Sequence, residues 1–66
     1  MHLISTPNLE NADASYAALI AAHDGLSEEE SHAMNARLVL ILMNQIGIEA
    51  IISEALRLAR HPGEQV

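Results

Sequence analysis

Apolar and polar residues recur along the chain with helical spacing, and turn residues divide the pattern into three segments. The first predicted helix runs from about residue 13 to residue 23. Asn11 or Asp13 can cap its start, and Gly25 ends it. Four of its residues fall at i, i+3, i+4 and i+7 and so share one face: Tyr16, Leu19, Ile20 and His23. Alanines fill much of the remaining surface, so we expect a neighbouring helix to approach closely.

The second predicted helix begins with a capping box. Ser27 can accept a hydrogen bond from the backbone of Glu30, and the Glu30 carboxylate can accept one from the backbone of Ser27. The helix should continue to Ile46, after which Gly47 provides a left-handed C-terminal cap. The glutamates at residues 28–30 lie at the positive end of the helix dipole, so we interpret them as structural rather than catalytic.

A third helix is predicted from about Ile48 to Arg60, and its pattern is amphipathic. Its polar face includes Glu49, Ser53 and Arg57, which are spaced four residues apart as an exposed ladder. The opposite face is apolar and consists of Ile48, Ile51, Ile52, Ala55, Leu56 and Ala59.

These segments predict one all-α domain over residues 13–61, with the order helix, turn, helix, turn, helix. Pro7 disfavours a helix before it, so residues 1–12 are expected to form an extended N-terminal arm. Pro62 stops the third helix, and residues 62–66 are expected to be a C-terminal tail. The pattern of alternation typical of strands is absent, as is any internal repeat.

The central helix carries more apolar surface than two neighbouring helices can cover. Residues 38–43 are six consecutive apolar residues, and at about 100° per residue they surround the helix. We therefore expect the three-helix unit to be completed as a helical homodimer through this helix. The predicted interface is this run with two polar neighbours: Leu38, Val39, Leu40, Ile41, Leu42, Met43, Asn35 and Arg37.

The sequence leaves two alternatives for this predicted interface. The run could instead be an enclosed core helix in a monomer, if Leu3, Ile4 and Leu9 of the arm cover its third side. Asn35 lies on the side of Val39 and could set the register of a helix interface, or it could simply be solvated.

Composition strengthens the case for a partner. The chain has 66 residues, of which 50% are hydrophobic, one aromatic residue and no cysteine. A chain this short is close to the size at which a single core barely stabilises a fold, and disulfides are not available to help. Association with another chain is therefore the expected source of further stability.

Charge excludes two classes of partner. The net charge is −6, and the three arginines are too dispersed to follow a phosphate backbone, so we expect no binding to nucleic acid. An acidic chain is also a poor ligand for an anionic membrane surface. The first residues contain neither a basic cluster nor a long apolar run, which favours a cytoplasmic location without a signal peptide or membrane span.

The residue types that carry chemistry do not form a recognisable catalytic pattern. His23, Asp24 and His32 could build a metal site only across a turn, and no known spacing template matches them. The serines are accounted for by helix caps and polar faces, and the glycines are isolated turn residues rather than a phosphate-binding loop. We therefore expect no enzyme activity, no cofactor and no metal, with a small metal- or ligand-binding protein as an alternative.

Two strings give the chain a resemblance to a known family. They are His23-Asp24-Gly25-Leu26-Ser27 at the first turn and Asn35-Ala36-Arg37-Leu38 in the central helix. With these strings the chain resembles the short bacterial proteins called domain of unknown function 2783, from Pro7 to Arg60. The resemblance brings no catalytic residues. It implies a gene close to those of flavin-dependent aromatic hydroxylases, because members of the family are encoded near such enzymes.

Pattern and resemblance lead to one functional hypothesis and one alternative within the same class. The first is a non-catalytic protein that self-associates through its apolar central helix. The alternative is an accessory, stabilising subunit of a larger bacterial enzyme such as a flavin-dependent monooxygenase that hydroxylates aromatic compounds, because binding the folded form stabilises it.

Overall fold

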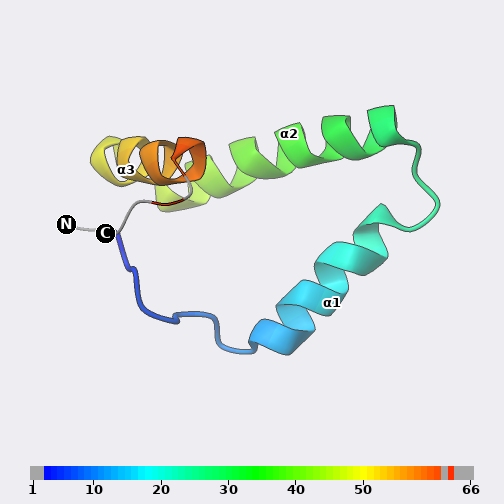
Figure 1. Cartoon of the computed structure of the whole chain (residues 1–66), viewed down its shortest axis with the longest axis horizontal. Coiled ribbons are helices and arrows are strands. Elements are labelled where there is room, and N and C mark those ends of the chain that lie inside the picture. The colour runs from blue at the N-terminus through cyan, green and yellow to red at the C-terminus, as the bar shows by residue number, and fades with distance from the viewer. Residues whose placement is uncertain (1–2, 62, 64–66) are drawn as a thin grey trace.

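The computed structural model describes residues 3–61 and 63 and contains three helices in this range. They are α1 (Ala12–His23), α2 (Glu28–Ile46) and α3 (Glu49–Arg60), in that order (Figure 1). No strand occurs in the described range, so the predicted all-α fold is confirmed. Residues 1–2 of the predicted arm and residues 62 and 64–66 of the predicted tail lie outside the described residues.

The first helix ends at the residue expected from the sequence and begins one residue earlier than expected, at Ala12. The side chain of Asn11 accepts a hydrogen bond of 3.0 Å from the backbone N–H of Ala14, which makes Asn11 rather than Asp13 the N-cap. The helix ends at His23, and Gly25 turns the chain with a φ of +78°. This left-handed conformation is one that glycine adopts without strain.

The second helix has both predicted caps. The backbone N–H of Ser27 donates to Oε1 of Glu30 at 2.9 Å, and the backbone N–H of Glu30 donates to Oγ of Ser27 at 3.1 Å. At the other end, Gly47 has a φ of +70° and donates its N–H to the carbonyl oxygen of Met43. The predicted bounds of the central helix are therefore confirmed.

The third helix starts one residue later than predicted, because Ile48 is its N-cap and has no side chain that could accept a hydrogen bond. One step of its predicted polar ladder is formed: Oγ of Ser53 donates to Oε1 of Glu49 at 2.7 Å. The helix ends at Arg60.

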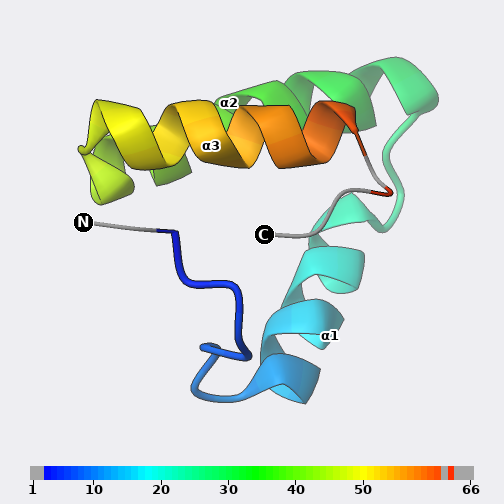
Figure 2. The same cartoon turned by 60° about the vertical axis from the view of Figure 1, so that its left-hand side comes forward.

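The three helices do not close around a common centre. In Figures 1 and 2, α3 lies beside the C-terminal half of α2, whereas α1 diverges from α2 after the turn that joins them. The radius of gyration is 13.5 Å, compared with about 11 Å expected for a compact domain of this length. Within residues 3–61 no side chain is buried, so the single chain has no enclosed core.

The segment before α1 forms no helix or strand from residue 3 to residue 11. It runs from the start of α1 back towards α3 (Figure 2). Leu3 is half-buried, but Ile4 and Leu9 are 59% and 67% exposed. These two side chains therefore do not enclose α2, as an apolar core in a monomer would require.

Candidate interaction surface

The amount of exposed surface is the first property of the candidate site. The accessible surface of the chain is 5743 Å². A compact monomer of 7.1 kDa is expected to expose about 4,100 Å². The excess of roughly 1,600 Å² is about twice the area that each partner contributes to a standard protein interface.

Four residues of the six-residue apolar run of α2 line two grooves. The first groove lies between α2 and α3 and has a volume of about 240 Å³. Val39 and Met43 border it from α2, and Ile52 and Leu56 border it from α3. This groove is where α3 packs on α2, so three of the predicted interface residues, Val39, Leu42 and Met43, lie at an interface inside the chain.

The second groove lies between α1 and α2, where the two helices diverge, and has a volume of about 440 Å³. Its lining is apolar except for one hydroxyl and consists of Ser15, Ala18, Leu19, Ala22, Met34, Leu38 and Leu42. Leu42 borders both grooves. The inner side of α2 is therefore one continuous apolar surface from α1 to α3.

Leu40 and Ile41 border neither groove. Each is 64% exposed, although both are large aliphatic side chains in the middle of a helix. Arg37 is exposed on the same helix. This side of α2 therefore presents exposed apolar side chains beside a charged one.

Asn35 joins α1 to α2 rather than being only solvated. Nε2 of His23 lies 3.0 Å from Oδ1 of Asn35, and Nδ1 of His23 lies 2.7 Å from the carbonyl oxygen of Leu19. The carbonyl oxygen can only accept, so Nδ1 donates. The sequence placed His23 on the shared face of the first helix but gave no indication of this partner, which lies 12 residues further along the chain.

The face predicted for α1 is divided in the structure, which corrects that expectation. Leu19 borders the groove with α2, and His23 bonds to α2. Tyr16 and Ile20 instead line a separate hollow along the other edge of this arc and are 65% and 53% exposed. The reason is that four residues at this spacing span a wide arc, and α2 contacts only one edge of it.

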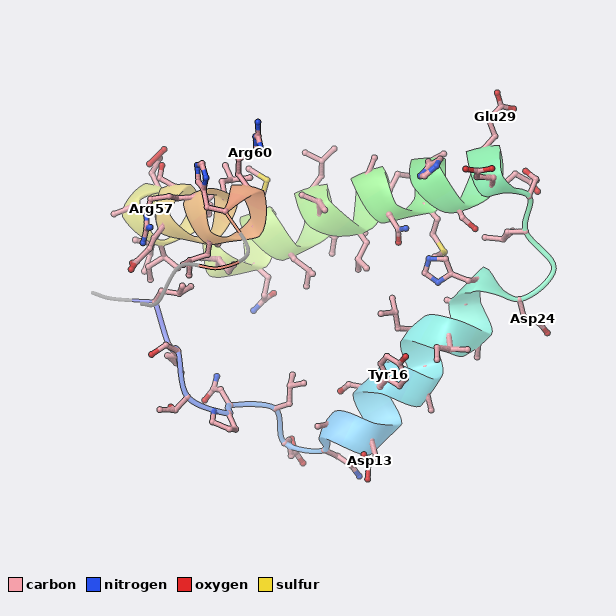
Figure 3. All side chains as sticks on the ribbon, in the orientation of Figure 1. Asp13, Tyr16, Asp24, Glu29, Arg57 and Arg60 are labelled. Atoms are coloured by element: carbon pink, nitrogen blue, oxygen red, sulfur yellow. The ribbon has the colours of Figure 1, made fainter. Side chains whose placement is uncertain are left out.

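Sequence reasoning missed the surface that these two residues form. Together with alanines and two carboxylates they line a shallow hollow on the side of α1, which consists of Asp13, Tyr16, Ala17, Ile20, Ala21 and Asp24. Figure 3 shows Asp13 and Asp24 at opposite ends of the helix with Tyr16 between them. The spacing of Tyr16 and Ile20 predicts that they share a face, but spacing alone does not distinguish a face that packs on a neighbouring helix from one that stays exposed.

The residues proposed for metal binding do not come together. Across residues 3–61 and 63, histidines and carboxylates form no group of three that could hold a metal ion. His23 already uses both ring nitrogens, and Nε2 of His32 lies 3.7 Å from Oε1 of Glu28 on the exposed side of α2. The alternative of a metal site at His23, Asp24 and His32 therefore has no support from this geometry.

The acidic start of α2 has one electrostatic feature. The hydrogen bonds from Ser27, first from its backbone N–H and then from its side chain, hold the pKa of Glu30 below its ordinary value. This is the effect expected of bonds that favour the charged form of a carboxylate. Glu30 is a capping residue whose charge stabilises the helix start.

Comparison with known proteins gives one family. A family model described as "Protein of unknown function (DUF2783)" matches residues 3–61. No curated protein and no solved structure matches the chain. None of the helices in the described residues has the length and apolar character needed to cross a membrane.

Proposed function

The chain belongs to the DUF2783 family of proteins of unknown function, and from this premise we propose that it is a non-catalytic interaction protein that self-associates into a homodimer through α2. The family assignment brings no activity with it. The proposal therefore depends on the surfaces of the helices described above.

A single observation carries the proposal: no side chain of residues 3–61 is buried in the single chain, although half of the sequence is hydrophobic. Burial of apolar surface is the main source of folding free energy, so a second copy that covers these side chains would supply it. The excess surface of roughly 1,600 Å² per chain is of the size that obligate homodimers bury.

The environment of the reactive groups supports a non-catalytic role. The hydroxyls of Ser27 and Ser53 form the capping and ladder hydrogen bonds, and the ring of His23 bonds to Leu19 and Asn35. These groups stabilise helices and their connection. In this proposal their contribution is structural.

The proposal includes two finer features from the sequence. Residues 1–12 act as an extended arm that lies on the partner copy, which is supported by the exposed side chains of Ile4 and Leu9. The homodimer works in the cytoplasm, where the net charge of −6 favours solubility.

The direct test is the absolute mass in solution, measured by size-exclusion chromatography with light scattering over a dilution series. We expect twice the mass of the chain at all but the lowest concentrations. A well-folded monomer at every concentration would contradict the proposal, because it would mean that the apolar surface needs no second copy.

A second candidate is supported by the outer surface of α1. Tyr16 and Ile20 lie outside the two grooves of α2, and tyrosine is common at the centres of protein interfaces. In this alternative the protein is an accessory subunit of a larger bacterial enzyme, such as a flavin-dependent aromatic hydroxylase. These surfaces would then bind the enzyme and stabilise its folded form.

The accessory role is tested by gentle purification of the tagged chain from its native host. We expect a flavin-containing protein, recognised by its visible absorbance, to be retained by the unchanged chain and lost with Tyr16→Asp. Ala14→Asp on the same helix controls for added charge, because Ala14 is exposed and lines neither this hollow nor the grooves of α2. If both variants retain the same proteins as the unchanged chain, this candidate is wrong.

A further inference from the structure

One line of residues along α2 combines half-buried and exposed apolar side chains. Successive members are separated by three or four residues, and at 3.6 residues per turn this keeps them within a narrow stripe of the helix. We call this set the α2 stripe, and it consists of Ser31, Met34, Leu38, Ile41 and Gln45. Met34 and Leu38 border the open groove between α1 and α2, and Ile41 continues the line.

The stripe has the pattern of a helix pair rather than of a lone surface helix. Its centre, Leu38 and Ile41, is apolar, and its ends, Ser31 and Gln45, are polar. In the single chain Ser31, Met34 and Leu38 are half-buried, and Met34 and Leu38 face the groove with α1, whereas Ile41 is 64% exposed. A second helix laid along the stripe would cover Ile41 and close the open side of the groove.

We infer that α2 packs antiparallel against α2 of a second copy along this stripe, so that Leu38 of each protomer lies against Ile41 of the partner. The inference rests on the proposed homodimer and specifies its contact and its direction. A two-fold axis between Leu38 and Ile41 makes the two halves of the contact identical. The partner's helix then adds to the apolar groove that Leu19 and Leu42 already line.

The charges of α2 favour the antiparallel direction. The first turn carries Glu28, Glu29 and Glu30, and the last turn carries no basic residue that could offset them. A parallel pair would bring six carboxylates together at one end, where like charges repel. An antiparallel pair places the two acidic ends far apart. It also sets the two helix dipoles in opposite directions, which is the favourable arrangement.

Leu40 and Ile41 provide a matched pair of positions for the test. They are adjacent, equally exposed at 64%, and about 100° apart around the helix, so only Ile41 lies on the stripe. Either residue changed to aspartate removes the same amount of apolar surface from the single chain. Only Ile41→Asp would place two carboxylates in the middle of the proposed contact, where unpaired charges are strongly unfavourable.

The experiment measures the masses of the unchanged chain, Ile41→Asp and Leu40→Asp by light scattering over the same dilution series. We expect Ile41→Asp to be monomeric at concentrations where the other two are dimeric. If Leu40→Asp dissociates, alone or together with Ile41→Asp, or if both variants stay dimeric, the stripe is not the contact. The homodimer itself would still stand in those cases. If the unchanged chain is a monomer, the proposed function fails instead.

The direction is tested separately by disulfide formation, since the sequence contains no cysteine of its own. A mixture of Leu38→Cys and Ile41→Cys protomers should give a mixed disulfide under mild oxidation, while each variant alone gives much less product. Efficient self-linking by each variant alone would indicate a parallel pair and overturn the antiparallel contact.

Discussion

The imidazole of His23 connects α1 to α2, with Nε2 3.0 Å from Oδ1 of Asn35 and Nδ1 2.7 Å from the carbonyl oxygen of Leu19. In a neutral ring Nε2 accepts, so the Asn35 amide turns its NH₂ group towards it; in a charged ring Nε2 donates to Oδ1. An asparagine can therefore keep this contact in either protonation state of the histidine. The contact joins the C-terminal end of α1 to the first half of α2.

Replacing Asn35 with leucine is expected to destabilise the fold by about 1 kcal/mol, the usual net contribution of one hydrogen bond. The change leaves Nε2 of His23 without this partner and loosens the connection between α1 and α2. Urea denaturation followed by circular dichroism measures the loss. Asn44→Leu is the matched control, because Asn44 is exposed on the same helix. Equal losses in the two variants would show that the hydrogen bond contributes nothing specific.

The capping box makes the start of α2 sensitive to acid. The pKa of Glu30 is lower in the folded chain than its ordinary value of 4.5, because Ser27 donates hydrogen bonds to the carboxylate. The stabilisation is therefore fully present above pH 4.5. It is lost as the pH falls through the lowered pKa, where the folded chain takes up the proton. We expect helix content to decrease in this acidic range.

The control for this effect is Glu30→Gln, which cannot titrate at this position. Its helix content should change less between pH 5 and pH 3 than that of the unchanged chain, since only the other carboxylates then respond. An NMR titration of the Glu30 side chain should give a midpoint below 4.5, and this midpoint should rise in Ser27→Ala. A midpoint that Ser27→Ala leaves unmoved would mean that the serine hydroxyl does not act on the carboxylate.

Replacing Gly47 with alanine is expected to destabilise the fold because of the backbone conformation at this position. Its φ is +70°, and a Cβ there would lie 3.7 Å from the carbonyl oxygen of Asn44, which is an ordinary contact. The loss in Gly47→Ala, about 1 kcal/mol, therefore comes from left-handed backbone strain and not from a clash. Thermal denaturation should show this loss for Gly47→Ala but not for Gly63→Ala, whose backbone is not left-handed. Equal stability of the two variants would contradict this explanation.

The helices could be predicted from the sequence because their ends are decided locally. Asn11, Ser27 with Glu30, and Gly47 each act on backbone groups within four residues, so the spacing alone identifies them. The start of α3 was misplaced by one residue, because Ile48 offers no side-chain cap that would mark it.

The arrangement of the helices could not be predicted in the same way. Periodicity shows that Tyr16 and Leu19 share an arc of α1, but only the angle between α1 and α2 decides that Leu19 lies in the groove and Tyr16 outside it. The same angle brings His23 to Asn35. For the apolar run of α2, the sequence predicted an excess of exposed surface, and the structure assigns Val39 and Met43 to the contact with α3.

The stability lost in Leu42→Ala should show whether the two grooves become one core when a second copy binds. It borders both grooves but is 51% exposed in the single chain, so Leu42→Ala would cost only about 1 kcal/mol if the chain stayed a monomer. If dimerisation buries it, the loss rises to roughly 2–5 kcal/mol per chain. The midpoint of thermal unfolding would also rise with protein concentration, as it does for any obligate dimer. Leu40→Ala is the control, since Leu40 borders neither groove and should lose little. A small, concentration-independent effect of Leu42→Ala would mean that this side of α2 stays open to solvent.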